Sequence, residues 1–159
     1  MSDTAIKRVG LIGLGKMGGP MVRHMLAGGF TVTGYDVHAE LIEAAAKDGA
    51  AAAASPAEVA AASELILIAV GFDAEVESAL FGTDGVMEGV SGGAIIAICS
   101  TIAPSTVTKI QKRIGAAPVR LIDCPLTRGE QAAIDGKMLT MVGGEEIDFE
   151  ACRPVMECY

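Results

Sequence analysis

Three closely spaced glycines follow the first apolar run of the chain and restrict what this segment can become. The run begins at Val9, and the glycines are Gly13, Gly15 and Gly18. In a strand–turn–helix unit, the first glycine makes the tight turn, the second lets backbone approach a pyrophosphate, and the third lets helix pack on strand. Free N–H groups and the dipole at the start of such a helix favour an anion. The spacing therefore predicts a βαβ unit that binds a dinucleotide.

An acidic residue follows at the position that would bind the ribose of a dinucleotide. Asp36 ends the second apolar run. A carboxylate there accepts hydrogen bonds from the adenosine ribose hydroxyls and repels a 2′-phosphate, so we expect NAD rather than NADP as the cofactor. The alternative is that Asp36 caps a helix beginning near Ala39. Leu14, Lys16 and Met17 complete the predicted cofactor loop, in which Lys16 either approaches the pyrophosphate or lies in solvent.

Apolar runs alternate with helical segments along the whole chain. Most of these runs are continuous, which is typical of strands covered on both faces. Alternation at this spacing gives right-handed βαβ crossovers. We therefore expect one α/β domain over residues 1–159, with a Rossmann-type, doubly wound and mostly parallel sheet. The expected strands are 9–12, 31–35, 65–70, 94–98, 119–122 and 139–142, with a weak one at 50–54, and the expected helices are 17–27, 39–47, 56–62, 74–80, 104–114, 130–134 and 149–156.

Charge and composition exclude several classes of partner. The formal net charge is −8 and no basic run occurs, which argues against a nucleic-acid partner. No apolar run reaches the roughly 20 residues of a membrane span, and the first residues lack the pattern of a signal peptide, so we expect a cytoplasmic protein without a membrane segment. The four cysteines form no CxxC pair and only two histidines accompany them, so we expect reduced thiols and no metal site.

Two further loops follow apolar runs, at the edge where open α/β sheets bind ligands. Val70 and Gly71 end one run, and Ser100 and Thr101 follow another. Gly71 lets backbone approach a cofactor, and the two hydroxyls precede a helix that Pro104 helps to begin. We expect the nicotinamide near Val70, Gly71 and Thr101. The alternative for Ser100 and Thr101 is simple helix capping.

Five motifs in order resemble the β-hydroxyacid dehydrogenase family. They are Gly-Leu-Gly-Lys-Met-Gly from position 13, Asp36, Phe-Gly-Thr-Asp-Gly-Val from 81, Ser-Thr-Ile-Ala-Pro from 100, and Asp-Cys-Pro-Leu from 123 with Ala133 and Gly136 downstream. The family includes 3-hydroxyisobutyrate, tartronate semialdehyde and 6-phosphogluconate enzymes. The resemblance implies NAD(P)-dependent oxidation of a small β-hydroxy acid, or reduction of its semialdehyde, in a cleft between this domain and a second, helical one.

The resemblance also implies a substrate loop, with one departure from the family pattern. In the family, an Asp-x-Pro-Val-Ser-Gly-Gly loop holds the substrate's carboxylate and hydroxyl. Here Thr127 stands at the serine, Arg128 at the first glycine and Gly129 at the second. Ser100 is the other residue that we expect to contact substrate. We predict that Arg128 binds a substrate carboxylate, sulfonate or phosphate through paired hydrogen bonds, the alternative being an exposed arginine without that role.

The chain has no counterpart of the family's catalytic lysine, which lies in a Gly-x-x-Gly-x-x-x-Lys helix beyond the nucleotide domain. It ends at Tyr159. We therefore expect no catalytic residue in this chain, which holds the cofactor half of an active site without its acid/base residue. The helical catalytic and dimerisation domain of the family is absent from it, and we expect the full-length protein to be a homo-oligomer.

Three other interpretations of the chain stay open. The same nucleotide domain serves imine and other carbonyl reductases, which differ in the substrates that oxidise NADH. A non-catalytic module that binds NAD(H) as a sensor would bind the cofactor without turnover. A structural fragment with a vestigial pocket would bind no dinucleotide at all.

Overall fold

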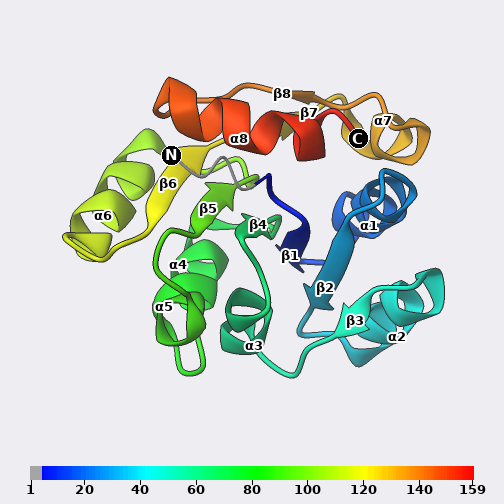
Figure 1. The fold of residues 1–159 in the computed structure, drawn as a ribbon, viewed down its shortest axis with the longest axis horizontal. Coiled ribbons are helices and arrows are strands. Elements are labelled where there is room, and N and C mark those ends of the chain that lie inside the picture. Colours follow the sequence, from blue (N-terminus) through cyan, green and yellow to red (C-terminus); the bar gives the residue numbers. More distant parts are fainter. Residues whose placement is uncertain (1–4) are drawn as a thin grey trace.

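The computed structural model describes residues 5–159, in which six parallel strands form one sheet with helices on both faces (Figure 1). The strands lie in the order β3-β2-β1-β4-β5-β6. This order reverses between β1 and β4, the switch point at which doubly wound sheets bind ligands. The predicted doubly wound, parallel sheet is confirmed. The strands are β1 (Arg8–Ile12), β2 (Thr31–Tyr35), β3 (Ala51–Ala52), β4 (Leu65–Ile68), β5 (Ile95–Ile98) and β6 (Arg120–Asp123).

Two apolar layers separate the sheet from its helices, because successive side chains of each strand point to opposite faces. In β4, Leu65 and Leu67 belong to one layer, and Ile66 and Ile68 to the other; all four are fully buried. Burying such a side chain contributes about 1.5–3 kcal/mol relative to leaving it exposed. The first layer packs against α1 (Gly18–Ala27), α2 (Ala39–Asp48) and α8 (Glu146–Met156), and the second against α3 (Pro56–Ala61), α4 (Asp73–Phe81), α5 (Val86–Gly89) and α6 (Pro104–Ile114).

A small antiparallel pair of strands lies after β6. β7 (Leu126–Thr127) pairs with β8 (Leu139–Thr140), and α7 (Gly129–Asp135) connects them. The strand expected at 139–142 is therefore shorter than predicted and lies outside the main sheet, with Leu139 exposed. The sequence analysis missed β7 and α5, because two and four residues are too few to show a period.

Within residues 5–159, no helix combines the length and the apolar character needed to cross a membrane. Nor do histidine, cysteine, aspartate and glutamate side chains of this region gather into a group that could hold a metal ion.

Candidate functional site

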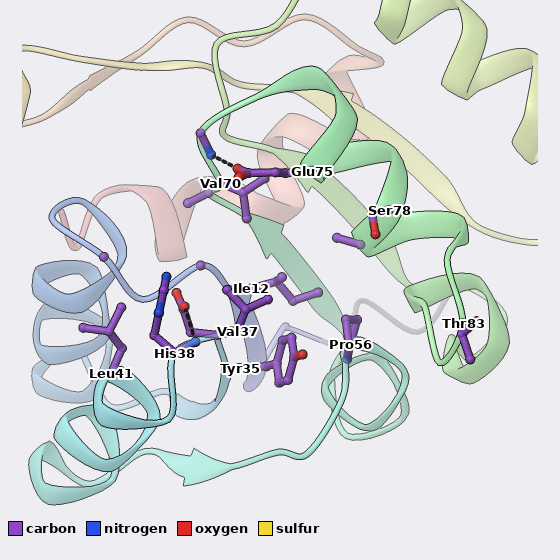
Figure 2. A pocket seen from close by; sticks show the side chains of 16 residues that line it. Ile12, Tyr35, Val37, His38, Leu41, Pro56, Val70, Glu75, Ser78 and Thr83 are labelled. Carbon is purple, nitrogen blue, oxygen red and sulfur yellow. Dashed lines mark hydrogen bonds between the residues drawn. The ribbon is translucent and has the colours of Figure 1, made fainter.

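Two adjoining cavities open beside the carboxyl ends of the strands. The larger, about 400 Å³, lies between the glycine loop, the end of β2 and the start of α4 (Figure 2). The smaller, about 210 Å³, lies between the loops that follow β4 and β5, and Ala69, Val70 and Gly71 line both. Of the predicted site residues, the larger cavity also contacts Gly13, Gly15 and Asp36, and the smaller contacts Met17, Ser100 and Thr101.

The three glycines of the loop after β1 differ in why they lack a side chain. Gly13 has a φ of +95°, and a Cβ there would collide with the carbonyl oxygen of Ala69. A Cβ on Gly18 would collide with the carbonyl oxygen of Gly13. The fold itself therefore requires these two glycines. A Cβ on Gly15 would meet no described atom within 4 Å, so this glycine leaves open a space that a ligand can fill.

The start of α1 suits an anion. Met17 is the N-cap residue and makes no side-chain cap bond, and the first turn of this described helix holds no acidic side chain. Gly19 N–H already donates to the Gly15 carbonyl and Pro20 has no N–H. The positive end of the helix dipole is thus left without an acidic side chain in the first turn of its own helix. The pyrophosphate of a dinucleotide fits this end of the helix, next to the space beside Gly15.

Asp36 does not cap α2, because His38 is the N-cap residue of that helix. Instead, the Asp36 carboxylate accepts hydrogen bonds from two backbone N–H groups. Leu14 N–H donates to Oδ2 over 2.7 Å and His38 N–H donates to Oδ1 over 2.9 Å. Figure 2 shows Tyr35, Val37 and His38 around this end of the larger cavity. Each carboxylate oxygen retains a further lone pair for a ribose hydroxyl.

The loop after β4 is held by side chains from two other segments. Ser100 is buried, and its hydroxyl oxygen accepts from Val70 N–H over 2.9 Å while donating to the carbonyl of Ile68. Glu75 Oε2 accepts from Gly71 N–H over 2.7 Å and from Phe72 N–H over 3.2 Å. The Ser100 hydroxyl is thus committed to backbone groups rather than directed to a substrate.

Asp73 caps α6 from the neighbouring helix. Its Oδ2 accepts from Ala103 N–H over 3.1 Å and from the Thr106 hydroxyl over 2.6 Å. The hydroxyl bond, and then the backbone bond, hold the pKa of Asp73 below its ordinary value. Ala103 is the N-cap residue of α6, so the capping alternative for Ser100 and Thr101 is wrong. The sequence analysis missed Asp73 because this cap comes from another element.

The predicted substrate loop leads into α7. Arg128 has a φ of +76° and Gly129 a φ of +75°, both in the left-handed region. The Arg128 guanidinium is exposed and donates to the carbonyl of Lys137 over 3.3 Å. Thr127, Arg128 and Gly129 do not line the smaller cavity, but Leu126 of the same strand does. Of residues 126–129, Leu126 alone therefore reaches this cavity.

Two contacts join α7 to the glycine loop and its helix. Lys16 Nζ lies 3.2 Å from Glu130 Oε2, so Lys16 is paired across the site, although 80% of its side chain is exposed. At the other end of α7, His24 Nε2 lies 3.1 Å from the Ala133 oxygen and 3.0 Å from the Ile134 oxygen. The predicted cofactor loop and the predicted substrate loop are thus neighbours.

The thiols near the smaller cavity belong to the core. Cys99, Cys124 and Cys152 are buried, and the Sγ atoms of Cys99 and Cys124 lie 3.6 Å apart. The Cys99 contact, and then burial, raise the pKa of Cys124 well above its ordinary value, and burial raises the pKa of Cys152 to about 12. The thiols of Cys124 and Cys152 therefore stay protonated at neutral pH, and all three cysteines pack as small apolar groups.

Residues 8–159 match the family model of the NAD binding domain of 6-phosphogluconate dehydrogenase. The chain belongs to this family. The match covers nearly the whole chain and confirms the resemblance that the five motifs indicated. An NAD-binding domain also accounts for the open space beside Gly15 and for the uncapped start of α1.

Similar proteins extend the comparison. The chain is 32% identical to 3-hydroxyisobutyrate dehydrogenase of Pseudomonas aeruginosa over 94% of this chain and 50% of that protein. It is 33% identical to 2-(hydroxymethyl)glutarate dehydrogenase of Eubacterium barkeri over 94% of this chain and 50% of that protein. The solved 3-hydroxyisobutyrate dehydrogenase of Salmonella typhimurium has a TM-score of 0.88 at 31% identity, covering 96% of this chain and 53% of that one. The chain spans about half the length of the curated relatives it matches.

Proposed function

We propose that this chain forms the cofactor half of a dehydrogenase that uses NAD and acts on a small β-hydroxy acid or its semialdehyde. The observation that carries the proposal is Gly15, whose missing side chain serves no packing contact and opens onto the larger cavity. Gly13, Leu14, Lys16, Met17 and Gly18 complete the loop around the pyrophosphate. The acid at the end of β2 supports NAD over NADP, because a 2′-phosphate beside the Asp36 carboxylate would be repelled.

In this proposal, the residues of this chain bind, orient and stabilise the reacting groups. A bound NAD(H) would supply the hydride acceptor or donor for the alcohol carbon of the substrate. Val70, Gly71 and Thr101 line the smaller cavity, which supports their assignment to the nicotinamide. No lysine, histidine, aspartate or glutamate occurs among the described residues that line this cavity. We therefore assign proton transfer to none of the described residues that line this cavity.

Arg128 favours a substrate that carries a second acidic group. Its guanidinium is exposed, and Leu126, two residues earlier, lines the smaller cavity. The left-handed backbone of Arg128 is a conformation that glycine adopts more readily. The relative from Eubacterium barkeri is named for 2-(hydroxymethyl)glutarate, which carries two carboxylates. We therefore assign the guanidinium to one of these acidic groups, bound through paired hydrogen bonds.

The substrate assignment is tested in the complete enzyme by steady-state kinetics. Arg128→Ala is expected to raise KM for hydroxy acids with a second acidic group by about tenfold or more, because a charge-assisted hydrogen bond is lost. 3-Hydroxyisobutyrate serves as the control substrate with one acidic group. An unchanged KM for every diacid would overturn the role of Arg128. NADH binding without turnover of any hydroxy acid, semialdehyde or imine would favour the sensor module instead.

A further inference from the structure

The Glu75 carboxylate holds the tip of the loop that borders both cavities. Figure 2 shows Glu75 on α4 reaching back to the backbone at the end of β4, where its Oε2 accepts from Gly71 N–H and Phe72 N–H. The preceding amides are also engaged, since Ala69 N–H donates to the carbonyl of Ile12 and Val70 N–H to the Ser100 hydroxyl. Four consecutive amides therefore have acceptors, and the two at the loop tip depend on Glu75.

The absence of a side chain at Gly71 leaves room for the Glu75 carboxylate. A Cβ on Gly71 would lie 3.2 Å from Glu75 Oε2, its one close contact among the described atoms, and Gly71 does not have a positive φ. The backbone conformation at this position thus permits any residue, and the missing side chain instead leaves room for the carboxylate. Phe72, the N-cap residue of α4, has no hydrogen-bond acceptor in its side chain. The Glu75 side chain, three residues later in the sequence, instead accepts from Phe72 N–H at the start of the helix.

We propose that Glu75 is a positioning residue that sets the affinity for the nicotinamide half of the cofactor. The inference rests on the proposed function. Gly71 is the most flexible kind of residue, and the Gly71 loop borders both cavities, where adenosine and nicotinamide halves would meet. By holding two amides, Glu75 orders this loop before the ligand arrives, so less conformational entropy is lost on binding.

The Glu75 side chain makes its hydrogen bonds at the wall of the larger cavity, outside the apolar core. This side chain is exposed, and its hydrogen bonds run to the loop rather than into either apolar layer. It also brings a negative charge to the wall of a cavity that accepts an anionic ligand, where like charges repel. Glu77, on the same helix, differs because its carboxylate pairs with Lys109 of α6 over 3.0 Å and does not line either cavity.

The test compares two ligands by isothermal titration into the 159-residue chain. ADP-ribose lacks the nicotinamide ring, whereas NADH carries it. Glu75→Ala is expected to weaken NADH binding by about tenfold, because the loop tip must then be ordered on binding, and to leave ADP-ribose binding unchanged. Glu75→Gln keeps an acceptor for both amides and is expected to restore most of the NADH affinity. Glu77→Ala removes the same charge from the same helix and should bind both ligands as wild type does.

Gly71→Ala provides a second variant that moves the carboxylate without deleting it. It should weaken NADH binding in wild type and have a much smaller effect in the Glu75→Ala background, since contacting residues are not additive. Equal losses for NADH and ADP-ribose, or unchanged NADH binding with an unchanged thermal midpoint, would overturn the proposal. Failure of the wild-type chain to bind either ligand would instead overturn the proposed function.

Discussion

The carboxylate of Asp36 accepts a hydrogen bond from the backbone N–H of Leu14 over 2.7 Å, which joins the end of β2 to the glycine loop after β1. The same side chain lines the larger cavity. One acid thus holds the loop in place and faces the site assigned to the ribose. Its substitution should alter both the affinity for the cofactor and the choice between NADH and NADPH.

Asp36→Asn is therefore expected to bind NADH about tenfold or more weakly, because an amide accepts weaker hydrogen bonds than a carboxylate and its NH2 group cannot accept. NADPH should lose less affinity, since the repulsion of its 2′-phosphate is removed. Titration calorimetry with both nucleotides gives the affinity ratio. Asp48→Asn is the matched control, because Asp48 pairs with Arg23 on the outer side of α1 and α2. An unchanged ratio in Asp36→Asn would show that this acid does not select the cofactor.

Arg128→Gly is expected to stabilise the chain by about 1 kcal/mol, since a non-glycine residue in the left-handed region costs roughly that much. The exposed bond from its guanidinium to the Lys137 carbonyl offsets little of this gain. The urea midpoint measures the change. Asp84→Gly, at the other described non-glycine position with positive φ, should give a smaller gain because aspartate tolerates this region better. A lower midpoint for Arg128→Gly would show that Arg128 stabilises the fold.

Glu64 should make stability fall in acid. Its Oε2 accepts from Lys7 N–H over 2.8 Å and from Arg8 N–H over 3.0 Å, and these bonds hold the pKa of Glu64 below its ordinary value. A lowered folded-state pKa gives stability that is present above the unfolded-state pKa of about 4.3 and is lost as pH falls through the folded-state value. Urea unfolding from pH 7 to pH 3 should therefore show a shallower loss for Glu64→Gln than for wild type.

Two other carboxyl groups also change the stability of the chain at low pH, and they do so in opposite directions. Asp73, with its lowered pKa, adds to the loss of stability as pH falls. Burial raises the pKa of Asp123, so protonation of Asp123 favours the folded chain. Asp73 and Asp123 are the same in wild type and in Glu64→Gln. The difference between the two stability curves therefore reports the contribution of Glu64 alone. Parallel curves for the two proteins would contradict the assignment to Glu64.

The sequence predicts the sheet and the glycine loop well because both depend on local signals. Continuous apolar runs mark the buried strands, and the clashes at Gly13 and Gly18 lie within one strand–turn–helix unit and the strand beside it. The contacts that shape the rest of the site join distant segments. Ser100 binds the backbone of another strand end, and Lys16 pairs with Glu130 of α7. No local pattern indicates such pairs.

Titration of NADH into wild type, Gly15→Ala and Gly18→Ala measures whether the space beside Gly15 binds a dinucleotide. Wild type should bind saturably at one site. Gly15→Ala should keep the wild-type thermal midpoint, because the added Cβ meets no described atom within 4 Å, and should bind NADH at least tenfold more weakly, a change of about 1.4 kcal/mol. Gly18→Ala should lose about 1–3 kcal/mol of stability from overpacking against Gly13. A folded wild-type chain that does not bind NADH at millimolar concentration, or a Gly15→Ala chain that binds it as tightly as wild type, would contradict the account.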